Sequence, residues 1–331
     1  MKLKKCAALL LVSSCLLTGC TTSSAKKVDS KYVVASLEKG NKTKNIFADN
    51  LYKDIIDNSS NNSTVFNAVL QNLVDQKFPV NDDMKEDAAT IIKQIKSAYK
   101  SNYGDNYKDS LNQALTSAGY KNLSEYRQRM IKQIQYAIFL LDYIDDHFDD
   151  VFNDYYQQCA PKYVSLIKIS VSDTSSPTDD ETSKLNEVKE LISNTDKSFG
   201  DIAQDYSDDS TSSKKGSLGI IDSKDTSGIA NSYGKDVFNA IEALSEGQVS
   251  DVITGDDGYY FVKVTSTDKK TLKKELKKTD IDSPLLAYDD YLQYVVYNSY
   301  KINYKDKDIK KIVQEVVNKA LEERKTERGE A

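Results

Sequence analysis

The chain has 331 residues, 39% of them hydrophobic and 29% charged, and its formal net charge is -6. This length allows about two domains, and the high charge content excludes a multi-pass membrane protein. The acidic balance disfavours nonspecific nucleic-acid binding, and one histidine with four cysteines disfavours a zinc site, so we expect neither nucleic acid nor a metal ion as a partner.

The first residues have the pattern of a secretory signal. Three lysines precede an apolar run over 7–17, which is too short to span a bilayer core of about 30 Å as a helix. The run ends in Leu17-Thr18-Gly19-Cys20, which resembles the lipobox of bacterial lipoproteins. The resemblance implies removal of residues 1–19, which takes the net charge to -9, and lipidation of Cys20. We therefore expect a protein held by lipid on the extracytoplasmic face of the cell membrane; the alternative is an ordinary signal peptide with a chance cysteine.

The next part of the chain divides into a tether and a helical domain. Residues 20–44 are rich in serine, threonine and lysine, which predicts a lipidated flexible tether with room for one short strand. Over 45–160 the apolar residues keep helical spacing, and this predicts a domain of helices. The last of these helices is expected to continue from Ser124 to Tyr156, a length of about 30 residues.

The pattern changes at Pro161, where the helical spacing ends. Alternating side chains predict a strand directly after it, and short apolar runs separated by turn signals predict more strands with helices between them. In chain order these elements are a strand over 163–171, helices around 185–192 and after Ser198, a strand over 216–221, a helix near 235–244 and a hairpin over 249–264. We therefore predict a compact α/β domain over 161–269.

Helical spacing returns over 270–331. We expect these C-terminal helices to pack on the N-terminal helical domain, so that the chain leaves that domain, forms the α/β domain and returns. The predicted fold class is α+β, with a helical domain formed by the N- and C-terminal segments and an α/β domain inserted between them.

Several fragments of the inserted domain together carry a family resemblance that none of them carries alone. In chain order they are 167–173, 199–209, 216–219, 240–244, 246–250 and 258–264. In their order and spacing the domain resembles a parvulin-type peptidyl-prolyl isomerase. With the lipobox, the helical domain and the returning helices, the whole chain resembles the PrsA-type foldase lipoproteins of Gram-positive bacteria.

The resemblance implies catalysis of rotation about the peptide bond before proline. Partial double-bond character gives that bond a barrier of about 18 to 20 kcal/mol. A catalyst needs an apolar cup for the proline ring and polar groups that stabilise the twisted amide better than the planar one. No cofactor is implied.

The residues implied for catalysis depart from the family pattern. Parvulins typically carry a histidine on the first strand, another on the last strand, and a cysteine or aspartate across the pocket. The aligned positions here hold Lys168, Tyr260 and Asp209. These three types can form a hydrogen-bonded catalytic set, because lysine donates, aspartate accepts and tyrosine does both. The alternatives are a solvated strand residue at Lys168, a half-buried sheet aromatic at Tyr260, and a loop acid or helix cap at Asp209.

The positions aligned with the family's substrate pocket are apolar, and they are Leu218, Ile221, Val237 and Phe238. Two functions stay open. The first is a membrane-anchored foldase that assists secreted proteins after translocation, by prolyl isomerisation and chaperone binding. The second is a catalytically degenerate parvulin that only holds unfolded secreted chains. The expected partners are unfolded or partly folded secreted proteins and, through the lipid anchor, the membrane; a homodimer also stays open.

Overall fold

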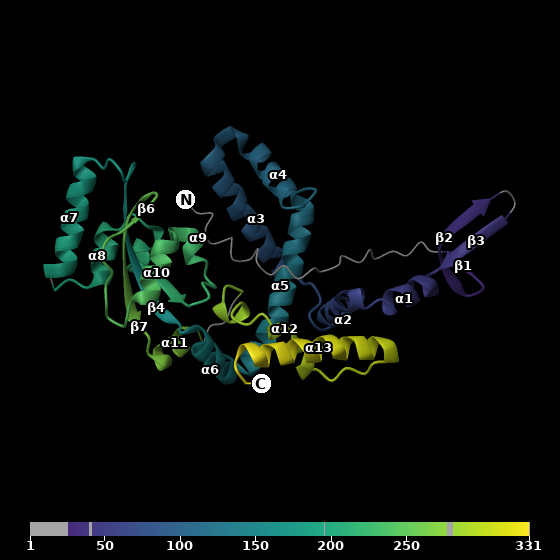
Figure 1. Cartoon of the computed structure of the whole chain (residues 1–331). Coiled ribbons are helices and arrows are strands. Elements are labelled where there is room, and N and C mark those ends of the chain that lie inside the picture. The colour runs from purple at the N-terminus through teal and green to yellow at the C-terminus, as the bar shows by residue number, and fades with distance from the viewer. Residues whose placement is uncertain (1–25, 40–41, 195, 277–280, 331) are drawn as a thin grey trace. The chain divides into compact units, whose positions relative to one another are not determined.

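The computed structural model describes residues 26–39, 42–194, 196–276 and 281–330 (Figure 1). The predicted signal and the lipidation site at Cys20 lie outside these residues. By its internal contacts the chain forms two compact units. The central unit contains Asp82–Asp289, and the terminal unit contains the described residues before Asp82 and those from Asp290 onwards. Helical segments precede and follow a mixed domain of helices and strands, so the predicted fold class is confirmed.

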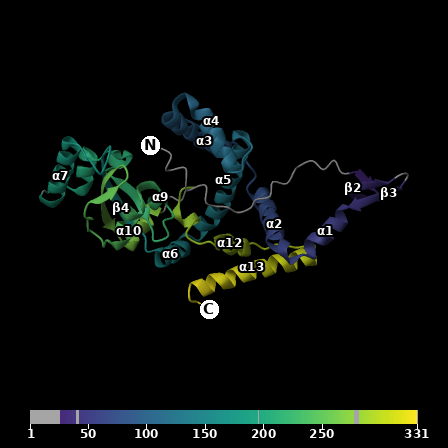
Figure 2. The same ribbon diagram turned by 45° about the horizontal axis from the view of Figure 1, so that its top comes forward.

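The terminal unit begins with a small antiparallel sheet. Its strands are β1 (Lys26–Val28), β2 (Lys31–Lys39) and β3 (Lys42–Phe47), in the order β1-β2-β3. Figure 2 shows the sheet joined directly to the following helix α1 (Ala48–Ile56). The sheet takes the place of most of the flexible tether predicted over 20–44. The polar composition of this segment does not predict the sheet. Its strands form because their backbone groups pair with one another, and such pairing cannot be recognised from the composition of one segment.

The other helices of the terminal unit come from both ends of the chain. They are α2 (Asn62–Lys77), which follows the short 3-10 turn η3 (Ser59–Asn61), and α12 (Leu292–Ser299) and α13 (Lys307–Glu327). Helix α13 packs along α2. Phe66 of α2 stacks on Tyr294 with 5.0 Å between ring centres and meets Tyr297 edge-on at 5.1 Å. The C-terminal helices therefore share an apolar core with an N-terminal helix.

The central unit begins with helices. They are α3 (Asp82–Tyr103), α4 (Tyr107–Ser117), α5 (Leu123–Asp146) and α6 (Phe148–Cys159), with the short turn η4 (Gly104–Asn106) before α4. The prediction of one continuous helix over 124–156 is wrong, because the backbone leaves the helical conformation at His147 (φ -120°, ψ 27°). Asp149 and Asp150 lie in the first turn of α6, where the helix dipole favours carboxylates. These acids stabilise a new helix start more than the interior of a long helix.

The mixed domain follows α6, and its elements agree with the predicted order. They are β4 (Lys162–Ser170), α7 (Asp179–Asn194), α8 (Phe199–Tyr206), η5 (Ser210–Lys214), β5 (Ser217–Ile221), α9 (Ile229–Tyr233), α10 (Lys235–Ala243), β6 (Ile253–Gly255), β7 (Gly258–Ser266), α11 (Lys269–Leu276) and η6 (Pro284–Leu286). The four strands form one antiparallel sheet in the order β5-β4-β7-β6.

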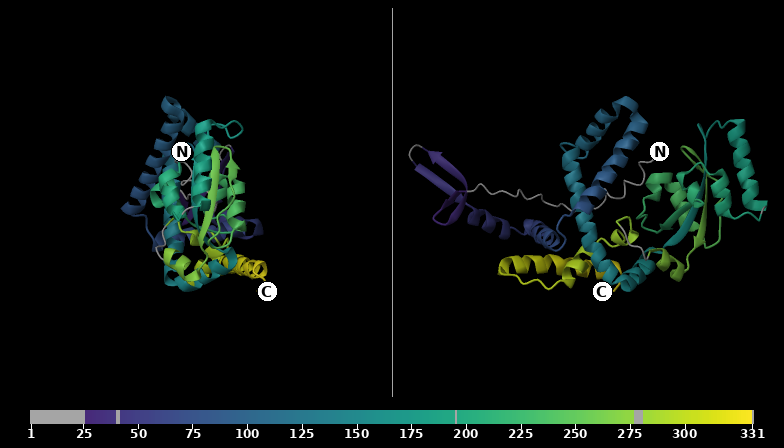
Figure 3. Two further views of the ribbon diagram at one scale, coloured as in Figure 1. Left: turned by 90° about the vertical axis from the view of Figure 1, so that its left-hand side faces the viewer. Right: turned by 180° about the vertical axis from the view of Figure 1, so that it is seen from behind.

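Helices cover both faces of this sheet. Helices α9 and α10 pack on one face against a cluster that includes Leu166 and Tyr260, and α7 and α8 pack on the other against one that includes Ile167 and Phe261. In the right-hand view of Figure 3, α7 lies on one side of the strands and the helices of the other layer lie opposite. Consecutive residues of β4 are buried, and since neighbouring side chains on a strand point to opposite faces, both faces of β4 are buried. Lys168, two residues after Leu166, lies on the face covered by α9 and α10.

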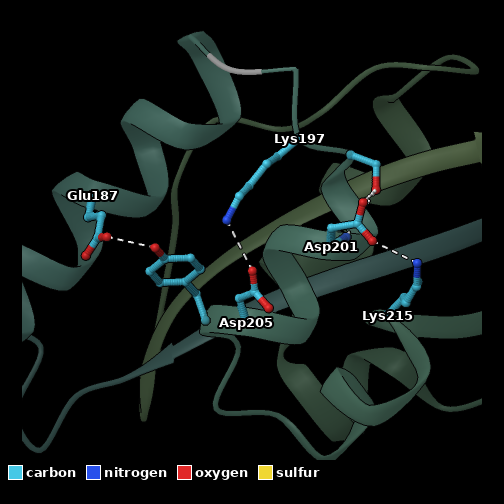
Figure 4. Close-up of polar contacts among 7 residues, drawn as sticks. Glu187, Lys197, Asp201, Asp205 and Lys215 are labelled. Atoms are coloured by element: carbon cyan, nitrogen blue, oxygen red, sulfur yellow. Dashed lines mark hydrogen bonds and ion pairs between the residues drawn. The ribbon is translucent and has the colours of Figure 1, made fainter.

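Ion pairs surround helix α8, as Figure 4 shows. Lys197 Nζ lies 3.2 Å from a carboxylate oxygen of Asp205, and Lys215 Nζ lies 2.7 Å from one of Asp201. All four side chains are well exposed, so these pairs add little stability. Burial of Phe199 on the sheet anchors the helix instead.

Candidate functional site

Strand pairing brings two of the predicted site residues together. Lys168 on β4 is directly opposite Tyr260 on β7 in the antiparallel register, so the two side chains lie on the same face. Both are buried, with 2% and 1% of their surfaces exposed. Lys168 Nζ lies 5.5 Å from the centre of the Tyr260 ring. The solvated-strand alternative for Lys168 does not describe this buried side chain.

A residue that the sequence reading did not single out joins this pair. Asp257 lies in the turn between β6 and β7, and one of its carboxylate oxygens is 2.5 Å from Lys168 Nζ. The Tyr260 hydroxyl donates to the other oxygen. The Asp257 side chain is 46% exposed. Asp257 therefore connects the buried lysine and tyrosine to solvent.

Glycine fixes the turn that holds Asp257. Gly258 has a φ of +152°, and a Cβ on it would lie 2.2 Å from the carbonyl oxygen of Ile169. A Cβ on Gly255 would lie 2.6 Å from a ring carbon of Tyr260. Glycine at these two positions lets the hairpin pass close to β4 and to the tyrosine ring.

Asp209 reaches the same region from the loop after α8. The backbone N–H of Asp208 donates to the Lys168 carbonyl at 2.8 Å, which ties this loop to β4. Asp209 is 5% exposed and accepts from the backbone N–H of Thr211 at 2.8 Å, so it caps the turn η5. It also accepts from the hydroxyl of Tyr233 at 3.5 Å. The predicted alternative of a helix cap is thus realised, together with a contact to a second tyrosine.

Tyr233 links the two halves of this polar set. It lies at the end of α9, and its ring meets that of Tyr260 edge-on with 6.1 Å between centres. The set therefore consists of Lys168, Asp209, Tyr233, Asp257 and Tyr260. The sequence reading missed Tyr233 because the short helix α9 was not predicted, and it missed Asp257 because nothing local separates that residue from Asp256 beside it in the turn.

The two tyrosines remain protonated donors over the physiological pH range. Burial raises the pKa of Tyr260, and the hydrogen bond to Asp257 and the negative charges of Asp257 and Asp209 raise it further. Burial also raises the pKa of Tyr233, and Asp209 adds to the effect through its charge and its hydrogen bond. The site thus presents neutral hydroxyl groups beside carboxylates and one buried ammonium.

The predicted substrate-binding residues divide by burial. Leu218 and Phe238 are half-buried and pack against the apolar cluster that contains Tyr260. Ile221 and Val237 belong to that cluster and are each 1% exposed. In this structure Leu218 and Phe238 keep part of their apolar surface accessible, whereas Ile221 and Val237 are closed into the core, and a substrate-binding role stays a prediction.

Two further observations concern metal-binding groups and membrane-spanning helices. Within the described residues, no group of three or more histidine, cysteine, aspartate or glutamate side chains is arranged to bind a metal ion. Over the same residues, none of the helices has both the length and the apolar character that crossing a membrane requires.

The fold and the site define a class of protein. A four-stranded antiparallel sheet covered on both faces carries buried polar groups at the positions aligned with a family's catalytic set. Residues 166–266 match the family described as Rotamase: PPIC-type PPIASE domain. The predicted parvulin resemblance is confirmed, and with it the assignment of a peptidyl-prolyl isomerase domain by family.

The similar proteins extend this resemblance. A foldase protein PrsA of Staphylococcus aureus and one of Staphylococcus epidermidis are each 31% identical to this chain over an alignment of 141 residues that covers 40% of this chain. The matched region spans 41% of the length of these relatives. The resemblance to PrsA-type foldases is thereby confirmed over the region that these relatives share with the chain.

Solved structures of PrsA are also similar. The crystal structure of PrsA from Bacillus subtilis is 21% identical, with 85% of this chain and 97% of that chain covered and a TM-score of 0.39. The foldase protein PrsA from Streptococcus pneumoniae is 20% identical, with 85% and 99% covered and a TM-score of 0.39.

Proposed function

We propose that this chain is a membrane-anchored extracytoplasmic foldase that assists secreted proteins after translocation. Its inserted domain accelerates cis/trans isomerisation of peptide bonds before proline, and the protein also holds unfolded or partly folded chains. The observation that carries the proposal is the polar set of Lys168, Asp209, Tyr233, Asp257 and Tyr260 beside apolar surface, within a domain of the rotamase family.

The chemistry follows from the peptide bond. Rotation to about 90° removes the resonance that makes the amide planar, so the carbonyl oxygen loses negative charge and the proline nitrogen becomes a hydrogen-bond acceptor. The hydroxyls of Tyr260 and Tyr233 can donate to such a nitrogen once they turn from Asp257 and Asp209, and this bond forms only in the twisted state. Leu218 and Phe238 provide apolar contact for the proline ring. Lys168 and Asp257 compensate each other and hold Tyr260 in position.

The test is an exchange measurement by NMR on a proline peptide, which requires no coupled protease. The protein is the chain from residue 20 onwards with Cys20→Ala. We expect acceleration of exchange, and we expect Asp209→Ala and Tyr260→Phe each to reduce it by on the order of tenfold, as loss of a hydrogen bond to a charged group does. Lys197→Ala, which removes an exposed ion pair beside α8, is the matched control and should leave the rate unchanged. A fully active Asp209→Ala and Tyr260→Phe pair would remove these residues from the mechanism.

A second function is favoured by a specific observation. Lys168 and the Tyr260 hydroxyl both bind Asp257, and Ile221 and Val237 are closed into the core. Polar groups that already bind one another, beside apolar side chains that are closed into the core, suit a protein that binds unfolded chains without catalysis. If the folded protein gives no exchange acceleration yet suppresses aggregation of an unfolded client, the holdase function replaces the isomerase.

Membrane anchoring is a separate part of the proposal and has its own test. The sequence around Cys20 supports lipidation. We expect Cys20→Ala to release the protein from the membrane fraction or to leave its signal uncleaved. Normal processing with unchanged, detergent-dependent membrane retention would contradict a lipid anchor. Formation of a homodimer stays a prediction, which analytical ultracentrifugation of the same variant tests.

A further inference from the structure

Exposed apolar side chains are concentrated in one short stretch of the described chain. Seven of the eight exposed large hydrophobic residues lie between 28 and 55, and these seven are Val28, Tyr32, Val34, Ile46, Leu51, Tyr52 and Ile55. Four of them belong to the small sheet of β1, β2 and β3. Apolar surface gathered in this way marks a place where another surface binds.

The same sheet has an unusual charge for this protein. Residues 26–47 contain six lysines and two acidic residues, a net charge of +4. The other residues after position 19 carry a net charge of -13. The partner of this sheet is therefore expected to be anionic, because charge complementarity steers binding and like charges oppose it.

Basic and aromatic side chains alternate on the sheet surface. Lys27 is directly opposite Tyr32 across β1 and β2, and its Nζ lies 4.6 Å from the centre of the tyrosine ring. Lys31 precedes Tyr32 on β2, so its side chain lies on the other face with Val28, and its Nζ is 3.3 Å from a carboxylate oxygen of Asp49. Lys44 on β3 is exposed as well. Tyrosine rings at the headgroup level, with lysines reaching phosphate, form the chemistry of a bilayer surface site.

The distance to the anchor favours the same partner. Five residues separate Cys20 from the first residue of β1, Lys26. A fully extended chain spans at most about 3.3 to 3.6 Å per residue, so β1 begins within roughly 20 Å of Cys20. With Cys20 lipidated, as proposed above, the sheet begins within roughly 20 Å of the lipid anchor and so stays near the membrane surface.

We propose that the sheet of β1, β2 and β3 docks on anionic phospholipid in the membrane that holds the anchor. Lys27 and Lys44 contact lipid phosphate, and Tyr32 and Val34 enter the interface. This inference rests on the proposed membrane anchoring. A second copy of the chain is disfavoured as occupant, because two sheets of charge +4 would face each other.

Vesicle binding tests the lysines. The chain from residue 20 onwards with Cys20→Ala is sedimented with vesicles of phosphatidylcholine alone or with vesicles that also contain the anionic lipid phosphatidylglycerol. We expect binding only to the anionic vesicles. Neutralising Lys27 and Lys44 to glutamine should weaken it by on the order of 25-fold at low salt, about fivefold per lysine. Glutamine at the exposed positions Lys305 and Lys307 removes the same charge elsewhere and should leave binding unchanged.

A fluorescence probe tests the position of the sheet, because the chain contains no tryptophan. In a Tyr32→Trp variant the single indole should shift its emission to shorter wavelength when anionic vesicles are added. Tyr103→Trp carries the same probe at an exposed position on α3 and should show no shift.

Three outcomes would overturn the inference. They are no binding to anionic vesicles, equal binding by the lysine and control variants, and an emission shift of Tyr32→Trp that follows protein concentration without vesicles, which would show a second copy on the sheet. None of these measurements depends on isomerase activity. A failed Cys20→Ala fractionation test with intact vesicle binding would instead contradict the lipid anchor alone.

Discussion

At the scale of single residues, the site holds two opposite charges with unequal access to water. Lys168 is 2% exposed, whereas the Asp257 side chain is 46% exposed. An ammonium taken out of water is costly unless a counter-charge accompanies it, whereas a half-exposed carboxylate can recover hydration. Lys168, at the position aligned with a family histidine, therefore depends on Asp257 for its counter-charge, and the family pattern does not specify this turn residue.

This inequality predicts an asymmetric effect of substitution. Asp257→Ala should lower the free energy of unfolding by about 2 to 4 kcal/mol, because the buried ammonium of Lys168 loses this counter-charge. Lys168→Met should cost less than about 1 kcal/mol, since it keeps the buried stem and frees Asp257 to water. Urea denaturation of the two variants measures both values. The double variant should be about as stable as Lys168→Met alone, and equal costs for the two single variants would contradict the argument.

At the scale of elements, the start of α7 depends on one carboxylate. Glu181 accepts from the backbone N–H of Thr178 at 2.7 Å and from that of Ser172 at 2.9 Å, while the Glu181 N–H donates to the Thr178 hydroxyl at 3.2 Å. This is a capping box. The backbone hydrogen bond from Thr178, followed by the one from Ser172, lowers the pKa of Glu181 to about 2.

The lowered pKa of Glu181 determines how its contribution to stability depends on pH. The folded pKa lies below the unfolded one, so the ionised Glu181 stabilises the protein above about pH 4.5, and this stability is lost as the pH falls towards 2. Glu181→Gln should lower the thermal midpoint at pH 6, and the difference from the parent should narrow steadily as the pH falls below 4.5 towards 2. Thermal scans from pH 7 to 3 measure it. Glu190→Gln, an exposed change on the same helix, is the control, and a gap that is constant with pH would contradict the role of the charge.

At the scale of the whole molecule, a buried junction joins three segments of the central unit. Tyr155 of α6 donates to Asp222 after β5 at 2.8 Å, and both residues are fully buried. The Tyr155 ring meets Tyr288 edge-on at 5.5 Å, and the Tyr288 hydroxyl donates to Asp154 at 2.9 Å. The Lys224 ammonium donates to the Tyr288 carbonyl at 2.8 Å. The helix before the inserted domain, the domain itself and the segment after it are thereby held together.

Loss of one hydroxyl at this junction should be measurable. Tyr155→Phe should lower the free energy of unfolding by about 1 to 2 kcal/mol, because the buried Asp222 carboxylate loses a donor while the ring packing is kept. Chemical denaturation of the whole chain measures the change. Tyr103→Phe, at an exposed position in the same unit, should leave the midpoint unchanged. An unchanged midpoint for Tyr155→Phe would mean that the junction does not contribute to stability.

Periodicity in the sequence was enough for most of the secondary structure of the inserted domain, though not for α9, and for part of its site. Alternation over 163–171 defines β4, and antiparallel pairing with β7 then places Lys168 opposite Tyr260. The apolar spacing of α7 is also readable, because one face must be buried on the sheet. Such features depend on neighbours a few positions apart, so the linear sequence contains them.

The tertiary structure alone decided which groups surround these residues. Asp257 and Tyr233 join the site from a turn and a short helix whose local sequences carry no distinguishing pattern. The burial of Ile221 and Val237, and the sheet in place of a tether, likewise depend on partners distant in the chain. Periodicity reports which face of an element is buried, whereas the partner of a buried charge is set by how separate elements pack, and that information is not local.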